Sequence, residues 1–492
     1  MLFNSTGFIF VFMPVVVIGF LLLVRAGRGG VALWLLLAAS YVFYGWAEPS
    51  LVMLLAASTL FNYAVGKAIV HAVRTARPRL TRGLLWLGVG VDLGVLGYFK
   101  YANFFVTTAS QLTGVATSLA PIALPVGISF FTFTQIAYLV DAARGEVETV
   151  RFVDYFLFVS YFPHLVAGPI LHHKATVPQF RASVARGLDL RSFVLGLSIF
   201  AIGLIKKVVI ADQVAPFADA IFDHARTKPL GALDAWSGAL AYTFQIYFDF
   251  SGYSDMAVGL SLLFGIRLPL NFASPYKATS IVDFWTRWHI SLSRFLRDYL
   301  YIPLGGNRRG STRRYANLMT TMLLGGLWHG AGWTFVAWGA LHGIYLVIDH
   351  VIRAVWPWHV SGGRWTVGIT WAKRLAVFVA VVIAWVLFRA DSIGSAGAVL
   401  SAMAGQFGRG HLPPRPALAW FLACFVIVWG LPNTYRVFTR ASLEDRSGDA
   451  SPPAPRFLVW RPTQPWAVAT ALALVAGILA ITDFSPFLYF RF

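Results

Sequence analysis

The chain has 492 residues, of which 58% are hydrophobic and only 12% are charged. Soluble globular proteins carry about 25% charged residues, so the composition excludes an ordinary soluble domain and predicts an all-α polytopic membrane protein. The formal net charge is +19, but the basic residues are dispersed between apolar runs and accompany no nucleic-acid motif. We therefore expect this charge to meet membrane lipids and set topology, with no nucleic acid as partner. A single cysteine, Cys424, excludes an internal disulfide and a zinc site built on several thiolates.

Apolar runs that approach or exceed the ~20 residues of a membrane span recur from one end of the chain to the other. Several are shorter than a span and others are too long for one, so we expect about 11–13 membrane segments, some re-entrant or broken. No repeat of fixed length is visible, which favours one integral-membrane domain over residues 1–492. Residues 436–465 are polar and rich in proline, and we expect them to form a cytoplasmic loop.

Two carboxylates, Asp249 and Asp255, lie within or at the end of an apolar run, in the stretch QIYFDFSGYSD. An unpaired carboxylate is strongly disfavoured inside a membrane, so each should meet a cation or a hydrogen-bond donor. Two interpretations stay open. Either residue could form a structural ion pair between helices, or it could orient a catalytic group and help to bind substrate.

The next stretch, DFWTRWHISLSRFLRDYLY, mixes arginine with aromatic residues. Eight residues separate His289 from Arg297, so on one continuous helix they would share roughly one face. A helix lying at the membrane interface explains the mixture, and so does a wall for an anionic ligand that includes Arg287 and Arg297. The following loop, LGGNRRGSTRR, adds Arg308 and Arg309, which could bind phosphates or only set topology, because the loop matches no phosphate-binding fingerprint.

His329 lies in a run from Leu318 to Ile348 that contains no Lys, Arg, Asp or Glu. A titratable ring at membrane depth is costly unless it lines a cavity or meets a partner, which makes His329 a candidate catalytic residue. Glycines surround it and allow close approach of other backbones or of substrate; they are Gly325, Gly326, Gly330 and Gly332. His342, thirteen residues later, does not share its helical face, and we interpret it as a packed histidine.

These residues favour general-base catalysis by a buried histidine. No Gly-x-Ser-x-Gly elbow and no P-loop is present, and the other histidines have no carboxylate at metal-ligand spacing, so we predict no metal. Histidine suits the role because its ordinary pKa lies near neutrality.

The stretches together resemble the membrane-bound O-acyltransferase (MBOAT) family, in its bacterial branch of alginate O-acetyltransferases. The resemblance extends over nearly the whole chain and includes SYVFYGW, LPVGISFFTF, YFPHLVAGPI, QIYFDFSGYSDMAVGL, FWTRWHISLSRFLRDYLYIPLGGNRRG, NLMTTMLLGGLWHGAGWTFVAWGALHG and SPFLYFRF. The family's catalytic histidine matches His329, beside Trp328, and its second histidine matches His289.

The resemblance implies a ring of helices around a central cavity that contains the catalytic histidine. It implies transfer of an acetyl group from cytosolic acetyl-CoA, with no bound cofactor, for O-acetylation of an exported polysaccharide such as alginate. The implied setting is the bacterial inner membrane, with a periplasmic SGNH-type partner and polysaccharide export machinery. We take Trp328, Arg287, Arg297, Arg308, Arg309, Asp249 and Asp255 as candidate substrate-binding residues. The alternatives are D-alanyl transfer to teichoic acid and, in another class, a transporter or a lipid-linked sugar flippase.

Overall fold

The computed structural model describes residues 1–46, 48–148, 151–187, 189–355, 365–438, 454–481 and 486–488. Throughout these ranges the regular structure is helical, and no β-strand occurs in them. The chain divides into two compact units, the first of residues 1–203, 253–269 and 462–486 and the second of residues 204–252, 270–461 and 487–492. The assignment of the whole chain to one integral domain remains a prediction. Two long helical segments that run through both units support it.

The first unit is built mainly from the amino-terminal helices, where η marks a π-helical or 3₁₀ turn. They are η1 (Phe8–Phe12), α1 (Met13–Arg25), α2 (Gly29–Gly45), α3 (Ser50–Arg74), α4 (Pro78–Leu96), η2 (Gly97–Tyr101), α5 (Ala102–Thr113), α6 (Ile128–Ala143), α7 (Phe152–Ser160), α8 (Phe162–Leu165), α9 (His173–Arg186), α10 (Leu190–Leu204) and, late in the chain, α21 (Gln464–Leu479). Helix α10 continues without a break into η3 (Ile205–Ala211) and α11 (Asp212–His224) of the second unit. Helix α12 (Ala232–Leu263) begins in the second unit and ends in the first.

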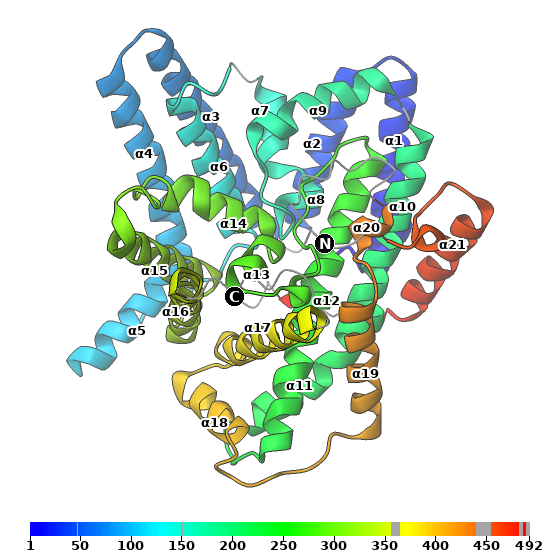
Figure 1. Ribbon diagram of the computed structural model, residues 1–492. Helices are drawn as coiled ribbons and strands as arrows, with labels where there is room; N and C mark the ends of the chain where they lie inside the picture. Colours follow the sequence, from blue (N-terminus) through cyan, green and yellow to red (C-terminus); the bar gives the residue numbers. More distant parts are fainter. Residues whose placement is uncertain are drawn as a thin grey trace. The chain divides into compact units, whose positions relative to one another are not determined.

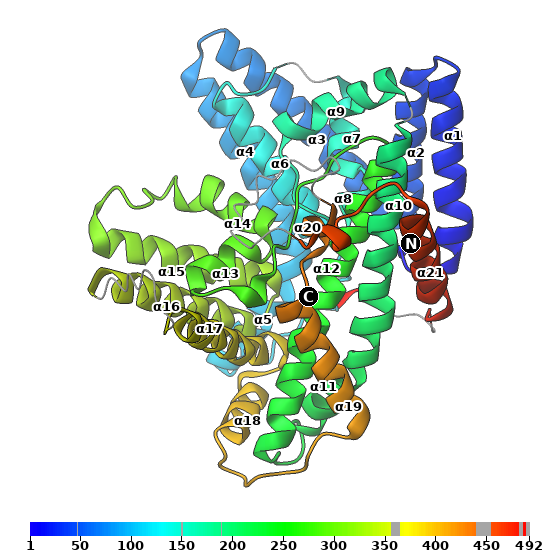
Figure 2. The same ribbon diagram turned by 45° about the vertical axis from the view of Figure 1, so that its right-hand side comes forward.

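The second unit contains the sequence stretches that carry the candidate catalytic residues. Its remaining elements are η4 (Pro275–Lys277), α13 (Ile281–Arg287), α14 (Ile290–Leu296), η5 (Arg297–Tyr301), α15 (Gly310–His329), α16 (Trp333–Val355), α17 (Trp365–Arg389), α18 (Ile393–Met403), α19 (Arg415–Phe425), η6 (Val426–Gly430), α20 (Thr434–Phe438) and η7 (Arg456–Leu458). Helices α13 to α17 lie together in both ribbon views (Figures 1 and 2). The predicted loop 436–465 therefore includes the end of α20 and η7, and its residues 439–453 lie outside the described residues.

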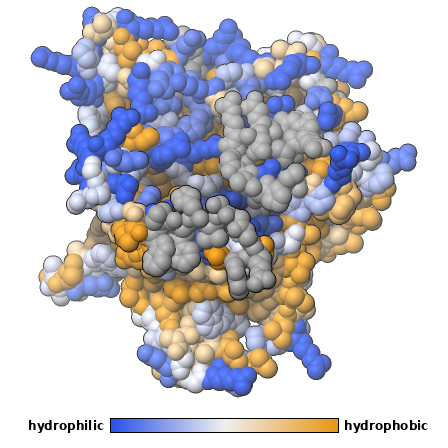
Figure 3. Space-filling model, viewed as in Figure 1, coloured by the Kyte–Doolittle hydropathy of each residue, from blue (hydrophilic) through white to orange (hydrophobic). Residues whose placement is uncertain are grey.

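Membrane-crossing segments account for the apolar composition. Six helical segments among the described residues are long and apolar enough to span a bilayer, and five shorter apolar helices accompany them. Large apolar side chains are exposed on many helices, and Figure 3 shows hydrophobic residues open on the face in view. Because lipid is the favourable surroundings for such residues, the chain is a multi-pass membrane protein, as its composition predicts.

Two segments that look continuous in sequence are broken in the structure, and both breaks fall at a candidate histidine. The apolar run 318–348 separates into α15, which ends at His329, and α16, which begins at Trp333. The stretch 283–301 separates into α13 and α14, with His289 immediately before α14. The expectation that His289 and Arg297 share a helical face is wrong, because His289 precedes the helix and a π-helical turn at Arg297 shifts the angular spacing.

Candidate active site

His329 is the last residue of α15 and is 4% exposed. The helix ends there because Gly330 adopts an extended conformation, with φ −157° and ψ 150°. Glycines then let α15 and α16 pack closely: a Cβ on Gly326 would lie 2.3 Å from the Phe335 carbonyl oxygen, and one on Gly339 would lie 2.4 Å from that of Met322. The predicted role of the glycines in close backbone approach is thus confirmed at Gly326.

His289 is fully buried and adopts a left-handed backbone conformation, with φ 44° and ψ 55°. Few non-glycine residues adopt it, and such strain persists where the surrounding structure holds it. The neighbouring segment supplies that support on both sides of the histidine: the Ala273 N–H donates to the Arg287 carbonyl at 2.9 Å, and the Ile290 N–H donates to the Asn271 carbonyl at 3.0 Å. Two hydrogen bonds therefore fix the chain around one strained residue.

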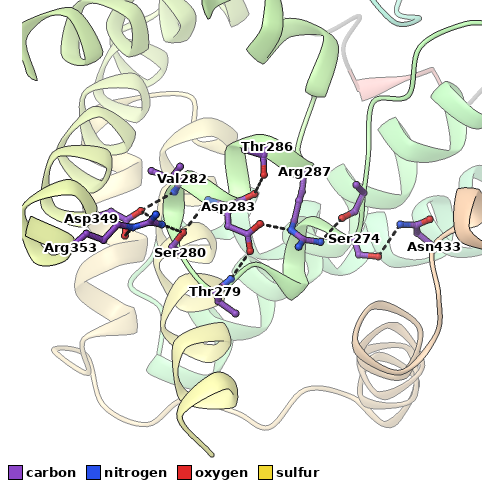
Figure 4. A network of polar contacts seen from close by, with 11 residues as sticks. Ser274, Thr279, Ser280, Val282, Asp283, Thr286, Arg287, Asp349, Arg353 and Asn433 are labelled. Carbon is purple, nitrogen blue, oxygen red and sulfur yellow. Dashed lines mark hydrogen bonds and ion pairs between the residues drawn. The ribbon is translucent and has the colours of Figure 1, made fainter. Parts of the chain in front are cut away.

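A polar network holds the helix that leads to His289 (Figure 4). Arg287 is 9% exposed, pairs with Asp283 at 2.6 Å and donates to the Ala273 carbonyl at 3.2 Å. At the start of α13 the Ser280 hydroxyl accepts the Asp283 N–H at 3.0 Å, an N-cap. Asp349 of α16 accepts the Val282 N–H at 3.1 Å, so the helix after His329 also fixes the helix before His289.

The structure brings the two candidate catalytic histidines together. The ring centroids of His289 and His329 lie 6.4 Å apart, and Trp328 lies beside both, at 6.1 Å and 4.9 Å. Trp338 of α16 and Phe388 of α17 contact the His329 ring at 5.1 Å and 5.2 Å. At 6.4 Å between centroids the ring nitrogens are too far apart for a direct hydrogen bond of ~3 Å, so the two imidazoles are neighbours that do not bond to each other.

Asp249 is 1% exposed and meets the cation that its burial requires. Its Oδ1 atom lies 2.7 Å from the Lys207 ammonium, which also contacts Asp212 at 2.8 Å. The sequence interpretation of Asp249 as a buried ion pair between helices is confirmed, and Lys207 is a residue that sequence reasoning missed. The signal was present, because Lys207 stands in an apolar run of span length and needs a partner as much as Asp249 does.

The remaining candidate substrate-binding residues differ in their surroundings. Asp255 belongs to the first unit, and the Arg297 side chain is 60% exposed and pairs with Asp298 at 2.7 Å. Arg308 and Arg309 are exposed, in the turn that leads into α15. For all of them a role in substrate binding stays a prediction.

The aromatic contacts of His329 from α16 and α17 had no signal in the sequence. Trp338 stands nine residues after His329 in the chain and reaches it because the two helices fold back on each other. His342 is fully buried as predicted for a packed histidine, with its ring centroid 4.8 Å from that of Trp338. Trp338 therefore contacts two histidines that do not share a helical face.

The chain is similar to known proteins over most of its length. Residues 50–388 match the model of the membrane-bound O-acyltransferase family, a range that includes both histidines. The chain is 42% identical, over all of both chains, to the probable alginate O-acetylase AlgI of Azotobacter vinelandii. It is 43% identical to the peptidoglycan O-acetyltransferase of Helicobacter pylori, over 83% of this chain and 80% of that protein.

A more distant similarity links the chain to the teichoic acid D-alanyltransferase of Streptococcus thermophilus, at 30% identity over 45% of this chain and 56% of that protein. The family match covers more than half of the chain, and the similarity to the Azotobacter protein extends from end to end. This chain belongs to the membrane-bound O-acyltransferase family and is a multi-pass membrane acyltransferase.

Proposed function

We propose that the protein transfers an acetyl group from acetyl-CoA to a hydroxyl, with His329 as general base, for O-acetylation of an exported polysaccharide such as alginate. The observation that carries the proposal is the pair of buried histidines, His289 and His329, 6.4 Å apart at two helix breaks. Full-length similarity to alginate O-acetylases supports the acetyl group and the polysaccharide over D-alanyl transfer, because the similar teichoic acid D-alanyltransferases align with about half of the chain.

In the proposed reaction the neutral imidazole of His329 takes the proton from the acceptor hydroxyl as that oxygen attacks the thioester carbonyl carbon. The carbonyl oxygen becomes negatively charged, and a hydrogen bond from His289 stabilises it. When the tetrahedral intermediate collapses, the carbon–sulfur bond breaks and the coenzyme leaves as a thiol with the proton from His329. His329 thus acts on the acceptor and His289 on the donor, which fits two rings that are close but not hydrogen-bonded to each other.

The donor is proposed to bind with its phosphates near Arg308 and Arg309, at the start of α15, and its thioester at His329, the end of that helix. A helix of this length, 20 residues, spans about 30 Å, so the donor would lie extended along α15. The expected consequence is that Arg308→Gln with Arg309→Gln raises KM for acetyl-CoA and leaves kcat nearly unchanged. The same variant should show an unchanged KM for S-acetyl-N-acetylcysteamine, because this short thioester has no phosphates.

The acceptor is proposed to receive the acetyl group outside the bacterial inner membrane, through a periplasmic SGNH-type partner that works with polysaccharide export machinery. A second acceptor, peptidoglycan, is favoured by the similarity to the Helicobacter pylori enzyme over most of both chains. Analysis of acetyl esters on the polysaccharide and on the peptidoglycan of cells with and without the gene separates the two acceptors.

The test of the reaction itself uses purified protein in detergent with labelled acetyl-CoA and a water-soluble polysaccharide acceptor. Thioester cleavage by the wild type and its loss in His329→Ala would support the donor and the catalytic residue together. Equal cleavage by both proteins would contradict the role of His329. Turnover with a D-alanyl carrier protein and none with acetyl-CoA would replace the proposed donor.

A further inference from the structure

We infer that the carboxyl-terminal residues Phe487 and Leu488 belong to the active-site structure and position His289. The inference goes beyond the proposed function and rests on it for the role of His289. Phe487 is 1% exposed and Leu488 is 5% exposed, so these residues lie in the interior of the second unit. Two separate contacts link them to adjacent residues of α12, Asp249 and Phe250.

The first contact is electrostatic. The Leu488 N–H donates to the Oδ2 atom of Asp249 at 3.0 Å, while Oδ1 of the same carboxylate meets the Lys207 ammonium at 2.7 Å. Lys207 also pairs with Asp212, so one ammonium faces two carboxylates and the backbone N–H shares the negative charge of Asp249. Buried carboxylates require such donors, and a charge-assisted hydrogen bond is stronger than one between neutral groups. The Leu488 backbone is therefore bound to α12 by a buried charged group.

The second contact is steric and continues to the site. The Phe487 ring lies 5.7 Å from the ring of Phe250, and Phe250 also contacts His289, at 4.7 Å with the two planes at 86°. Successive residues of a helix point about 100° apart, so Asp249 holds the backbone of the carboxyl-terminal segment while Phe250 packs against its side chain. Phe250 therefore contacts both Phe487 and the imidazole of His289.

His289 needs such support because its backbone is strained. Hydrogen bonds between the Asn271–Ala273 segment and Arg287 and Ile290 fix the main chain on both sides of His289, but they do not set the orientation of its ring. The ring contacts Phe250 at 4.7 Å, Trp328 at 6.1 Å and His329 at 6.4 Å. Phe250 is the nearest of the three, so its placement by Phe487 determines where the imidazole points. Phe487 and Leu488 are positioning residues, because they act on the reacting atoms only indirectly, through Phe250 and His289.

The test compares Leu488→Pro, which removes the N–H that Asp249 accepts, with Leu488→Met, which keeps that N–H and the side-chain volume. Phe487→Ala removes the ring and Phe487→Leu restores part of its volume. We expect kcat to fall about tenfold in Leu488→Pro and Phe487→Ala, with KM for acetyl-CoA within twofold and partial rescue by Phe487→Leu. In a His289→Gln background the same changes should have little further effect, because the group that they position is gone.

A readout that does not depend on the reaction is carbethoxylation of histidine by diethyl pyrocarbonate, followed by mass spectrometry. Removal of the Phe487 ring should raise the modification rate of His289 several-fold. It should leave His342 unchanged, since that ring is also fully buried but makes its ring contacts with residues of α13, α16 and α17. Equal loss of kcat in the His289→Gln background, or an unchanged rate at His289, would overturn the inference. Failure of the acetyl-transfer assay would overturn the proposed function and leave the modification test intact.

Discussion

His289 and His329 are the same side chain at two helix breaks, but the chain breaks in opposite ways. His329 ends α15, and Gly330 after it takes the extended conformation, so His329 itself carries no strained backbone. His289 stands before α14 and carries the unusual conformation itself, at φ 44°. A residue of the first kind can be changed with little effect on its own chain, whereas a change at the second alters both the ring and the turn. At His329 the side chain alone matters, whereas at His289 the side chain and the backbone conformation both matter.

The largest effect is expected at His329. His329→Gln should lower kcat by about 10²- to 10⁴-fold, because general-base catalysis supplies a factor of that size and the amide cannot accept a proton at neutral pH. The protein should remain folded, since the backbone at this position is ordinary. Initial rates with labelled acetyl-CoA measure the first part, and size-exclusion chromatography in detergent with thermal unfolding measures the second. If His329→Gln also lowered the unfolding temperature substantially, the loss of rate would reflect a damaged fold, and the assignment of a purely catalytic role to His329 would be wrong.

At His289 we expect a smaller loss of rate and a larger dependence on the replacement. His289→Asn should fold, because asparagine tolerates the left-handed conformation, and should lose about 10²-fold in kcat as one oxyanion donor is weakened. His289→Val should also destabilise the fold by roughly 1–3 kcal/mol, because a β-branched residue is strained at positive φ. Unfolding temperatures of the two variants side by side test this. Equal stability would show that the strain at this position is unimportant.

The glycine contact between α15 and α16 comes next in size. Gly326→Ala places a Cβ 2.3 Å from the Phe335 carbonyl oxygen, which is backbone and cannot move aside cheaply. We expect a loss of about 1–3 kcal/mol in stability and a fall in kcat, as the helices separate and His329 shifts. Gly397→Ala is the matched control, since nothing lies within 4 Å of a Cβ there and alanine favours a helix. Similar losses in both variants would mean that close helix packing does not position His329.

Much of this site could be predicted from the sequence, but the backbone conformation at His289 could not. Membrane burial makes polar residues costly, so His329, Asp249 and the glycines stood out against an apolar background, and the family motifs added His289. The helix break at His289 was missed, because the sequence has no glycine or proline there to mark it. The left-handed turn is flanked by two hydrogen bonds, in which the Ala273 N–H donates to the Arg287 carbonyl and the Asn271 carbonyl accepts the Ile290 N–H. Asn271 and Ala273 lie well before His289 in the chain, so this pairing cannot be predicted from one sequence.

Two arginines that look alike in the sequence have different roles in the structure. Arg287 and Arg297 look alike in a stretch of alternating arginine and aromatic residues, and the sequence predicts substrate binding for both. In the structure Arg287 is buried against Asp283 and the Ala273 carbonyl, while the Arg297 side chain is 60% exposed. Arg287 therefore supports the turn at His289, and periodicity could not distinguish the two because the helix between them is interrupted.

The smallest effect is expected when each of these arginines becomes lysine. Arg287→Lys keeps the charge but not the planar group that reaches both Asp283 and the Ala273 carbonyl, so we expect a loss of about 1 kcal/mol in stability and a few-fold loss in kcat. Arg297→Lys should leave stability within about 0.5 kcal/mol, because an exposed ion pair contributes little. Thermal unfolding and steady-state rates on both variants measure these effects. If Arg297→Lys instead raised KM for acetyl-CoA and left stability unchanged, Arg297 would contact the donor. Arg287 would then be the one of the two that stabilises the fold.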